Sequence, residues 1–202
     1  MFDMKSEIIS IETKYKGWAR FSVVSVCLPN GQLVQREIED HGSAVAVLAF
    51  DPERKTAILV QQFRAPPFFL LGQEHTLEAI AGIQEDADSI TTARREALEE
   101  AGLHLHSLEC VATVWTMPSI STERMTRYLA AYRRTDRITE GGGVATEHEN
   151  ITVVEIELGK LAQLMDAGEL GDMKTLVLAQ ALKMRHPELF APKSDKDMWA
   201  HP

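Results

Sequence analysis

Apolar runs and alternating patterns predict strands over most of the first half of the chain. Segment 17–40 holds two β-rich stretches, "WARFSVVSVCL" and "QLVQREIED", around the turn sequence "PNG", and predicts a hairpin. Two continuous apolar runs, 43–50 and 56–64, predict a second and largely buried strand pair. Segment 65–75 contains two adjacent prolines, which cannot donate to a strand ladder, so it is predicted to be a loop. A short strand at 76–82 then enters a glycine turn.

The second half of the chain predicts a charged helix, further strands and two terminal helices. The helix covers 89–101, with Asp88 or Ser89 as N-cap and Gly102 in the left-handed position after its end. Its apolar stripe is formed by Ile90, Ala93, Ala97 and Ala101. The later strands are expected at 103–116, 124–134 and 151–158, and the last two helices at 159–170 and 173–185. This order of elements predicts an α+β domain in which helices pack on sheet faces.

Composition and charge exclude several classes of function. The net charge of −9 argues against a nucleic-acid partner, because a polyanion would be repelled. No apolar run approaches the roughly 20 residues needed to span a bilayer, so no membrane association is expected. The first residues lack the pattern of a signal peptide, and two cysteines without paired spacing predict a reducing, cytoplasmic environment.

The stretch "RREALEEAG" at 94–102 carries the strongest chemical signal. Glu96 and Glu100 are four residues apart and therefore share one face of the predicted helix, whereas Glu99 can pair with Arg95. Charged helices of this composition are most often solvated faces that bind nothing. However, two carboxylates on rigid backbone are also what a hard cation such as Mg²⁺ needs, together with water and a substrate phosphate. The preceding glycine turn, Ala81-Gly82, permits close approach of a backbone carbonyl.

Segment 81–103, "AGIQEDADSITTARREALEEAGL", resembles the Nudix box, G-x5-E-x7-R-E-U-x-E-E-x-G-U. The second half of the box matches through Arg95, Glu96, Glu99, Glu100, Gly102 and Leu103. In the first half, Asp88 replaces glutamate, and only six residues separate Asp88 from Arg95, one fewer than in the pattern. Ala97 is small where the pattern has a bulky apolar residue.

The resemblance covers roughly residues 17–185 and follows the order of the ADP-ribose and GDP-mannose pyrophosphatase branch of Nudix enzymes. It looks most like the GDP-mannose group. The matching segments are "QFR" (62–64), "LEAIAG" (77–82), "PSISTE" (118–123), "GGGV" (141–144), "ENITV" (149–153) and "GELGDMKT" (168–175). Ser119 departs from the glycine that this branch usually has after the proline.

The resemblance implies an α/β/α sandwich, the Nudix fold, with a mixed sheet, a loop-helix-loop catalytic motif and an N-terminal β-hairpin. The expected division is an N-terminal β extension (1–42), a Nudix hydrolase domain (43–190) and a flexible tail (191–202). The resemblance also implies a homodimer in which the N-terminal strands cross to the partner. This agrees with a hairpin that must bury its apolar face somewhere.

Site roles are then assigned by residue type and by the resemblance. Glu96, Glu100 and the carbonyl of Ala81 are expected to bind Mg²⁺, with Mn²⁺ as the alternative ion. Glu99 is an auxiliary that either binds the metal or is held by Arg95, and Glu78 matches a position that lines the same site. The general base that activates water is expected on a loop, from Glu149 with its neighbour Glu147, or from Glu123.

Two arginines are candidates for substrate binding. Arg64 in "QFR" is a phosphate clamp by its chemistry, since a guanidinium grips phosphate through paired hydrogen bonds. Arg36 in the predicted hairpin either reaches the substrate or is a surface arginine.

These observations predict a Mg²⁺-dependent pyrophosphatase that cleaves a nucleoside diphosphate sugar, GDP-mannose or ADP-ribose, to a nucleoside monophosphate and a sugar phosphate. Two alternatives stay open. One is a non-catalytic module that binds nucleotide sugars, for which the departures at Asp88, Ala97 and Ser119 leave room. The other is a hydrolase of a different diphosphate, such as a dinucleotide or coenzyme A, because pocket residues set that choice.

Overall fold

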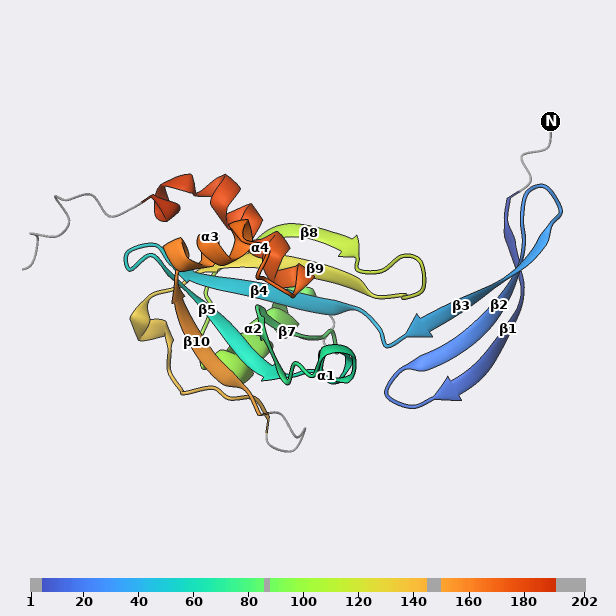
Figure 1. The fold of residues 1–202 in the computed structure, drawn as a ribbon, viewed down its shortest axis with the longest axis horizontal. Coiled ribbons are helices and arrows are strands. Elements are labelled where there is room, and N and C mark those ends of the chain that lie inside the picture. Colours follow the sequence, from blue (N-terminus) through green and yellow to red (C-terminus); the bar gives the residue numbers. More distant parts are fainter. Residues whose placement is uncertain (1–4, 86–87, 145–149, 192–202) are drawn as a thin grey trace, which may run out of the picture. The chain divides into compact units, whose positions relative to one another are not determined.

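The computed structural model describes residues 5–85, 88–144 and 150–191 (Figure 1). The chain forms two compact units. One contains the residues up to Ala44 together with Thr113–Met125, and the other contains Val45–Ala112 and the residues from Thr126 onward. The segment 113–125, far away in sequence, thus belongs with the N-terminal strands.

The first unit is built on a three-stranded antiparallel sheet of β1 (Glu7–Lys16), β2 (Arg20–Cys27) and β3 (Leu33–Asp40), in that order. The predicted hairpin is therefore confirmed as β2 and β3. Its turn contains Gly31 at φ +82°, in the left-handed region that glycine adopts without strain. The sequence did not predict β1, because every residue of this strand is exposed and no burial pattern marks it.

The second unit contains the main part of a seven-stranded sheet with the order β10-β5-β4-β9-β8, in which β6 pairs with β5 and β7 with β4. All residues of β4 are buried, as the continuous apolar run predicts. The strands are β4 (Ala44–Asp51), β5 (Thr56–Phe63), β6 (His75–Glu78), β7 (Ile80–Ile83), β8 (Glu109–Trp115), β9 (Arg124–Ala131) and β10 (Thr152–Glu157).

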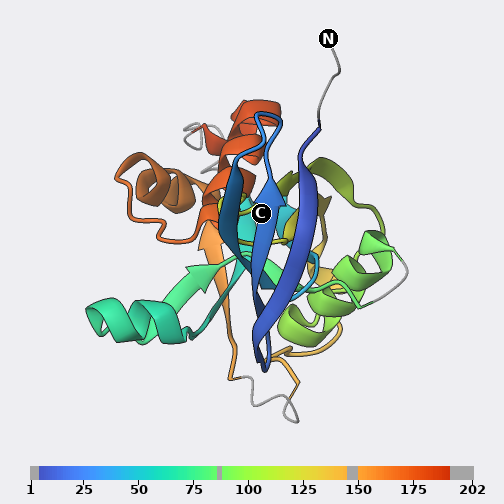
Figure 2. The same cartoon turned by 90° about the vertical axis from the view of Figure 1, so that its right-hand side faces the viewer.

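Helices cover both faces of this sheet. Figures 1 and 2 show α2 on one side and α3 and α4 on the other. The core between α2 and the sheet includes Val45, Val47, Ile58 and Ile80. The helical elements are α1 (Ala65–Leu71), α2 (Ser89–Ala101), α3 (Leu158–Asp166) and α4 (Met173–Arg185), with short 3-10 turns at Arg134–Asp136 and Pro187–Phe190. The α+β class is confirmed.

Local signals determine both ends of α2. The Asp88 carboxylate accepts hydrogen bonds from the backbone N–H groups of Ile90 and Thr91, each at 2.9 Å, so Asp88 is the N-cap. Gly102 has φ +69° and donates its N–H to Leu98. A Cβ at this glycine would lie 2.0 Å from the Thr139 carbonyl oxygen, so the position excludes a side chain.

Three sequence-based predictions are corrected by the structure. The segment at 65–75 is not all loop, because α1 occupies Ala65–Leu71. Its prolines lie at the first helical positions, where the missing N–H groups have no helical partner to lose. Strand β8 begins only at Glu109, so the first part of 103–116 is not strand. Ile90 is 41% exposed and does not belong to the buried alanine stripe of α2.

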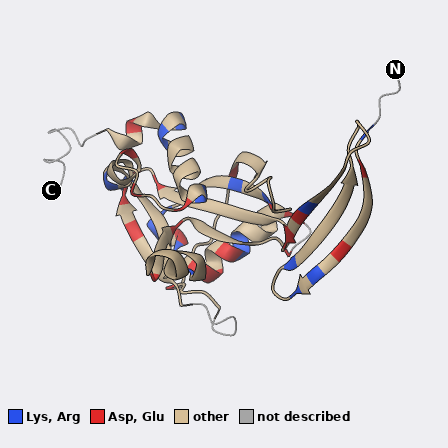
Figure 3. Cartoon of the chain, turned by 45° about the vertical axis from the view of Figure 1, so that its right-hand side comes forward, with Lys and Arg blue, Asp and Glu red and all other residues tan. Residues whose placement is uncertain are grey.

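Charged residues are distributed over both units. Lys, Arg, Asp and Glu positions are interspersed along the strands and helices, and α2 carries both signs (Figure 3). Within the described residues, no helix has the length and apolar character required to cross a membrane.

We expect Asp88→Ala to lower the free energy of unfolding by about 1 kcal/mol, because two N–H groups of α2 lose their acceptor. Thermal unfolding followed by circular dichroism measures the change. Asp88→Ser should retain most of the stability, and the exposed substitution Glu169→Ala is the control. Equal melting temperatures for Asp88→Ala and the control would contradict this role for Asp88.

Candidate active site

The two predicted metal-binding carboxylates lie on the buried face of α2. Glu100 is 1% exposed and Glu96 is 8% exposed. Glu100 accepts a 3.1 Å hydrogen bond from the backbone N–H of Ala81, the residue before the glycine turn. The structure therefore brings Glu96, Glu100 and the Ala81-Gly82 turn together, although both glutamates lie more than a dozen residues after the turn in the sequence.

Gly82 provides the space for one of these carboxylates. A Cβ built at Gly82 would lie 2.1 Å from Cδ and from Oε1 of Glu96. These atoms are the far end of a side chain that can move, so a larger residue would displace the carboxylate rather than break the backbone. The absence of a side chain at position 82 is therefore a requirement of the site, independent of backbone conformation.

Arg95 holds the carboxylates at the edge of this face. Its guanidinium donates to Glu99 at 2.8 Å, which confirms the predicted pair four residues apart. It also lies 2.9 Å from Glu96 Oε1. Arg95 thus fixes the orientation of the Glu96 and Glu99 carboxylates. The side chain of Glu99 is 32% exposed.

The donor set fits a hard divalent cation. Every candidate donor is an oxygen atom, from Glu96, Glu100 or the backbone at Ala81, and Mg²⁺ prefers oxygen donors. Among the described residues, no group of three or more acidic, histidine or cysteine side chains is arranged so that it could hold a metal ion by itself. The candidate protein donors in that part of the chain are two carboxylates and a backbone carbonyl, and water and substrate would have to complete the coordination.

Arg64 and Glu78, both predicted to line the site, form a bidentate ion pair. Arg64 Nε and Nη2 donate to the two carboxylate oxygens of Glu78 at 2.8 and 2.9 Å. This uses two of the five N–H donors of the guanidinium. Because Arg64 is partly exposed, its other donors remain for a phosphate.

Glu78 is buried and strongly acidic. Burial alone would raise the pKa of this carboxyl, but the hydrogen bond from Arg64 and the positive charge of Lys174 outweigh that effect and lower the pKa to about 2. Glu78 is thus charged at neutral pH and holds two cations in place.

Lys174 belongs to this cluster and was not assigned a role from the sequence. Its ammonium group pairs with Glu78 and with Asp172, the latter at 3.0 Å. The Thr175 hydroxyl, one residue later, accepts a 2.6 Å hydrogen bond from the backbone N–H of Ala79. The start of α4 is therefore anchored beside the strands that carry Glu78 and Ala81. The motif "GDMKT" contained the signal, but its partner is 96 residues away.

The described part of the glycine-rich loop is hydrogen-bonded to the end of α2. Backbone N–H groups of Gly142 and Gly143 donate to the carbonyls of Glu100 and Glu99 at 2.9 and 3.0 Å. These carbonyls belong to the last helical turn, where the C=O groups find no N–H partner within the helix. A Cβ at Gly141 would lie 2.4 Å from the Glu100 carbonyl oxygen, and φ there is +73°. Glu147 and Glu149, two candidate bases, follow on this loop and lie outside the described residues.

Glu123 and Arg36 belong to the first unit. The Glu123 carboxylate contacts His41, at 2.9 Å. Arg36 lies with Ser119 in a groove of about 430 Å³. The groove is lined by Val23, Gln35, Arg36, Glu37, Ser119 and Ile120. The described contacts thus do not include either residue in the cluster around α2.

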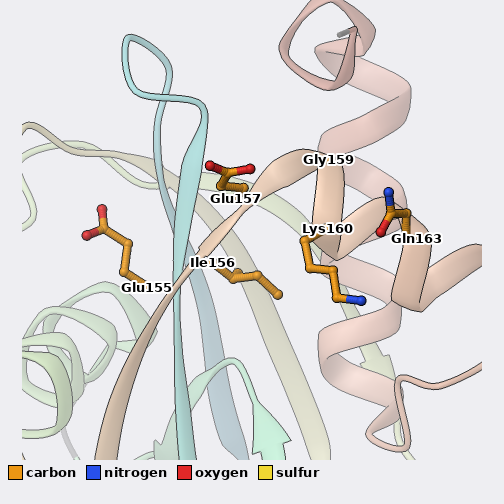
Figure 4. A pocket seen from close by; sticks show the side chains of 6 residues that line it. All are labelled: Glu155, Ile156, Glu157, Gly159, Lys160 and Gln163. Carbon is orange, nitrogen blue, oxygen red and sulfur yellow. The ribbon is translucent and has the colours of Figure 1, made fainter. Parts of the chain in front are cut away.

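A second hollow of about 560 Å³ lies where β10 meets α3, lined by Glu155, Ile156, Glu157, Gly159, Lys160 and Gln163 (Figure 4). Glu155 and Glu157 project from one side of β10, whereas Ile156 and Lys160 lie on the other. The charges do not converge on one point, and no predicted site residue lines this hollow.

Comparisons with known proteins agree on the family. The model of the NUDIX domain matches residues 40–176. The GDP-mannose pyrophosphatase of Cronobacter sakazakii is 34% identical over 159 residues, which cover 77% of this chain and 82% of that protein. The protein of the same name from Salmonella arizonae is 31% identical over 160 residues, covering 78% and 83%.

A solved structure supports the fold. A crystal structure described as an ADP compounds hydrolase has a TM-score of 0.70, with 18% identity, and the match covers 90% of this chain and 96% of that one. At this identity the likeness shows the fold alone. The fold expected from the Nudix resemblance is confirmed.

We expect Gly82→Ala to lower the affinity of the protein for Mg²⁺ by about 10- to 100-fold, because the new Cβ displaces the Glu96 carboxylate. Titration of Mg²⁺ or Mn²⁺ against the protein measures the loss in affinity. Gly159→Ala is the matched control, since a Cβ there meets nothing within 4 Å. The melting temperatures of both variants should stay near that of the wild type. Equal metal affinity in Gly82→Ala and Gly159→Ala would show that Glu96 does not need this space.

We expect Glu78 to make the free energy of unfolding depend on pH in the acidic range. Its pKa is about 2 in the folded protein and 4.5 unperturbed, so its stabilising contribution is complete above pH 4.5 and is lost as pH falls toward 2. Glu78→Gln should remove this part of the pH dependence and should also lower stability at pH 7, because Lys174 loses a buried ionic partner. Urea unfolding of both proteins at several pH values measures this. The exposed substitution Glu169→Gln is the control. A Glu78→Gln protein with the wild-type pH profile would contradict the assignment.

Proposed function

Because the chain belongs to the Nudix family of hydrolases, we propose that it hydrolyses the diphosphate of a nucleoside diphosphate sugar, GDP-mannose or ADP-ribose. The products are a nucleoside monophosphate and a sugar phosphate. The relatives named GDP-mannose pyrophosphatase support this substrate class.

One observation carries the proposal. The carboxylates of Glu96 and Glu100 are buried on one face of α2 against the Ala81-Gly82 turn. Burial of two neighbouring carboxylates is unfavourable unless a cation or hydrogen-bond donors compensate. A solvated helix face, the competing interpretation of this motif, would leave these side chains exposed.

Each residue of the cluster has a distinct task in this proposal. Glu96 and Glu100, with the carbonyl of Ala81, hold the divalent cation that Nudix hydrolases generally need, and we propose Mg²⁺, with Mn²⁺ as the alternative. When bound, Mg²⁺ supplies positive charge that offsets the charge of the diphosphate and of the transition state. Arg64 orients a phosphate group, and Glu78 keeps the guanidinium in one position. Glu99, held by Arg95, is the auxiliary carboxylate.

Hydrolysis also requires a base that removes a proton from the attacking water. The oxygen of water forms a bond to one phosphorus, the bridging P–O bond breaks, and the other phosphate leaves. Glu149, Glu147 and Glu123 are the candidates for this base. Gly142 and Gly143, which precede Glu147 and Glu149 on the same loop, are hydrogen-bonded to the end of α2, and this supports these two candidates.

The N-terminal strands support a homodimer as part of the same proposal. Ile8, Ile11 and Tyr15 of β1 are 60%, 65% and 64% exposed. Exposed apolar side chains on an edge strand are typical of a surface that a partner chain covers. Arg36 on β3 remains a proposed substrate contact. The low cysteine content supports a cytoplasmic location.

Two alternatives correspond to other outcomes of one experiment. A non-catalytic module would have the same fold and would bind a nucleotide sugar without hydrolysing it. A hydrolase of another nucleoside diphosphate derivative would use the same carboxylates with a different pocket.

We expect Mg²⁺-dependent release of monophosphates from one member of a substrate panel of GDP-mannose, ADP-ribose, UDP-glucose and a dinucleotide. A coupled phosphatase detects the products, and a chelator should abolish the signal. Glu96→Gln and Glu100→Gln should each lower kcat by about 100-fold or more, since a ligand of the cation loses its charge.

Glu109→Gln, an exposed substitution on β8, is the matched control and should retain the wild-type rate. Full activity in both Glu96→Gln and Glu100→Gln would refute the assignment. Binding of a nucleotide sugar without turnover by the wild type would favour the sensing module.

A further inference from the structure

In the first unit, His41 lies between two carboxylates. Its Nδ1 is 2.5 Å from Glu39 Oε1, and its Nε2 is 2.9 Å from Glu123 Oε2. The imidazole also stacks on the indole of Trp18, with ring centroids 4.8 Å apart and planes inclined by 21°. The side chain of His41 is only 13% exposed, as is that of Glu123. We refer to His41, Glu39, Glu123 and Trp18 as the His41 cluster.

This geometry determines the protonation state of the histidine. A neutral imidazole has one donor and one acceptor nitrogen, whereas an ionised carboxylate only accepts. If His41 were neutral, one bare nitrogen would face a carboxylate oxygen at hydrogen-bond distance. Both contacts are satisfied together only by an imidazolium that donates from both nitrogens.

The His41 cluster joins two segments that are far apart in the sequence. His41 follows β3 directly, and Glu123 ends the turn between β8 and β9. Backbone hydrogen bonds lie beside it, from Glu39 N–H to the Ile120 carbonyl and from Thr122 N–H to the Glu39 carbonyl, both at 2.9 Å. Asp40 reinforces the junction by accepting from the Thr122 hydroxyl at 2.6 Å and by pairing with Arg20.

The same turn forms one wall of the groove that contains Arg36. Ser119 and Ile120 come from the turn, and Gln35, Arg36 and Glu37 come from β3. The contacts between the turn and the end of β3 therefore set the relative position of these walls. The His41 cluster contributes ionic contacts to this junction.

We propose that His41 is a positioning residue: as an imidazolium bonded to both Glu39 and Glu123, it fixes the β8–β9 turn on the end of β3 and commits Glu123 to an ion pair. Glu123 then serves as an acceptor in this cluster and is not the general base of hydrolysis. This part rests on the proposed function, and it leaves Glu147 and Glu149 as the candidates for the base.

The electrostatics agree in direction. Burial lowers the pKa of His41, but the hydrogen bonds from the ring to Glu123 and Glu39 and the charges of these carboxylates raise it more, so the net shift is upward from 6.5. The other charged groups at this junction, Arg20 and Asp40, pair with each other. A raised pKa in the folded state means that the stabilisation is complete below pH 6.5 and is lost as pH rises through the folded pKa.

Nuclear magnetic resonance of the histidine rings in the full chain tests the cluster without any substrate. Long-range ¹H–¹⁵N correlation distinguishes a protonated from a bare ring nitrogen. We expect His41 to carry protons on both nitrogens at pH 6.5, with a titration midpoint above 6.5 that Glu123→Gln lowers. The same spectra contain an internal comparison, because His104 is exposed. A bare nitrogen on His41 at pH 6.5, or a midpoint at or below that pH, would overturn the proposal.

Kinetics with the substrate found in the panel test the consequence for Glu123. His41→Phe keeps a ring over Trp18 but removes both donors, so we expect KM to rise about threefold or more with a smaller change in kcat. His104→Phe is the matched control. Glu123→Gln should lower kcat by less than about tenfold, whereas loss of a general base lowers it by about 100- to 10,000-fold. A loss of that size would overturn the proposal.

The spectra and the kinetics distinguish failure of this proposal from failure of the proposed function. If the wild type hydrolyses nothing in the panel, the proposed function fails, while the ring spectra still decide whether His41 is the doubly bonded imidazolium. Thermal unfolding of each variant identifies a change that comes from loss of fold.

Discussion

The site depends on the burial of two carboxylates on the face of a helix that is otherwise packed with alanine. Glu96 and Glu100 share α2 with Ala93, Ala97 and Ala101, which are completely buried. Such small side chains let the helix approach the sheet closely, and that approach brings the carboxylates to the Ala81-Gly82 turn. Burying negative charge is unfavourable. The contacts that compensate for this burial include a hydrogen bond from the Ala81 backbone N–H to Glu100 and an ion pair of Arg95 with Glu96. A helix that was only a solvated surface would not require this arrangement.

A second ionic cluster complements the first with cations. Glu78 is a buried anion that holds Arg64 and Lys174, so two positive groups from β5–α1 and from α4 are fixed around one carboxylate. Arg64 keeps donors that Glu78 does not use. The second unit thus offers positive groups from one cluster and acidic groups from the other, which are the two kinds of charge that metal-assisted cleavage of a diphosphate requires.

The sequence predicted those parts of the fold that local chemistry determines. The ends of α2 followed from Asp88 and Gly102, and the face that carries Glu96 and Glu100 followed from their spacing, because both signals act within one or two helical turns. The sequence-based prediction was wrong where the position of a residue within an element decides its effect. Adjacent prolines indicated a loop, but at the first helical positions they start α1.

Features that depend on distant partners could not be predicted from one sequence. Strand β1 has no buried face, so nothing in its pattern distinguished it from an exposed segment. Lys174 and His41 obtain their roles from Glu78 and Glu123, which are 96 and 82 residues away. Spacing rules do not reach that far, although both residues lie in or next to motifs that the sequence showed. The roles of Glu147 and Glu149 and the boundaries of the domains remain predictions.

The glycine loop has a consequence for how this scaffold could be re-engineered. Gly142 and Gly143 donate their N–H groups to the carbonyls of Glu100 and Glu99, so this described part of the loop is hydrogen-bonded to the last turn of α2. Replacing this loop by one from a relative, in order to change substrate preference, would remove these hydrogen bonds from the helix that carries Glu96 and Glu100, the proposed metal ligands. A successful chimera would therefore have to exchange the segment from Glu99 to the end of the loop as one cassette.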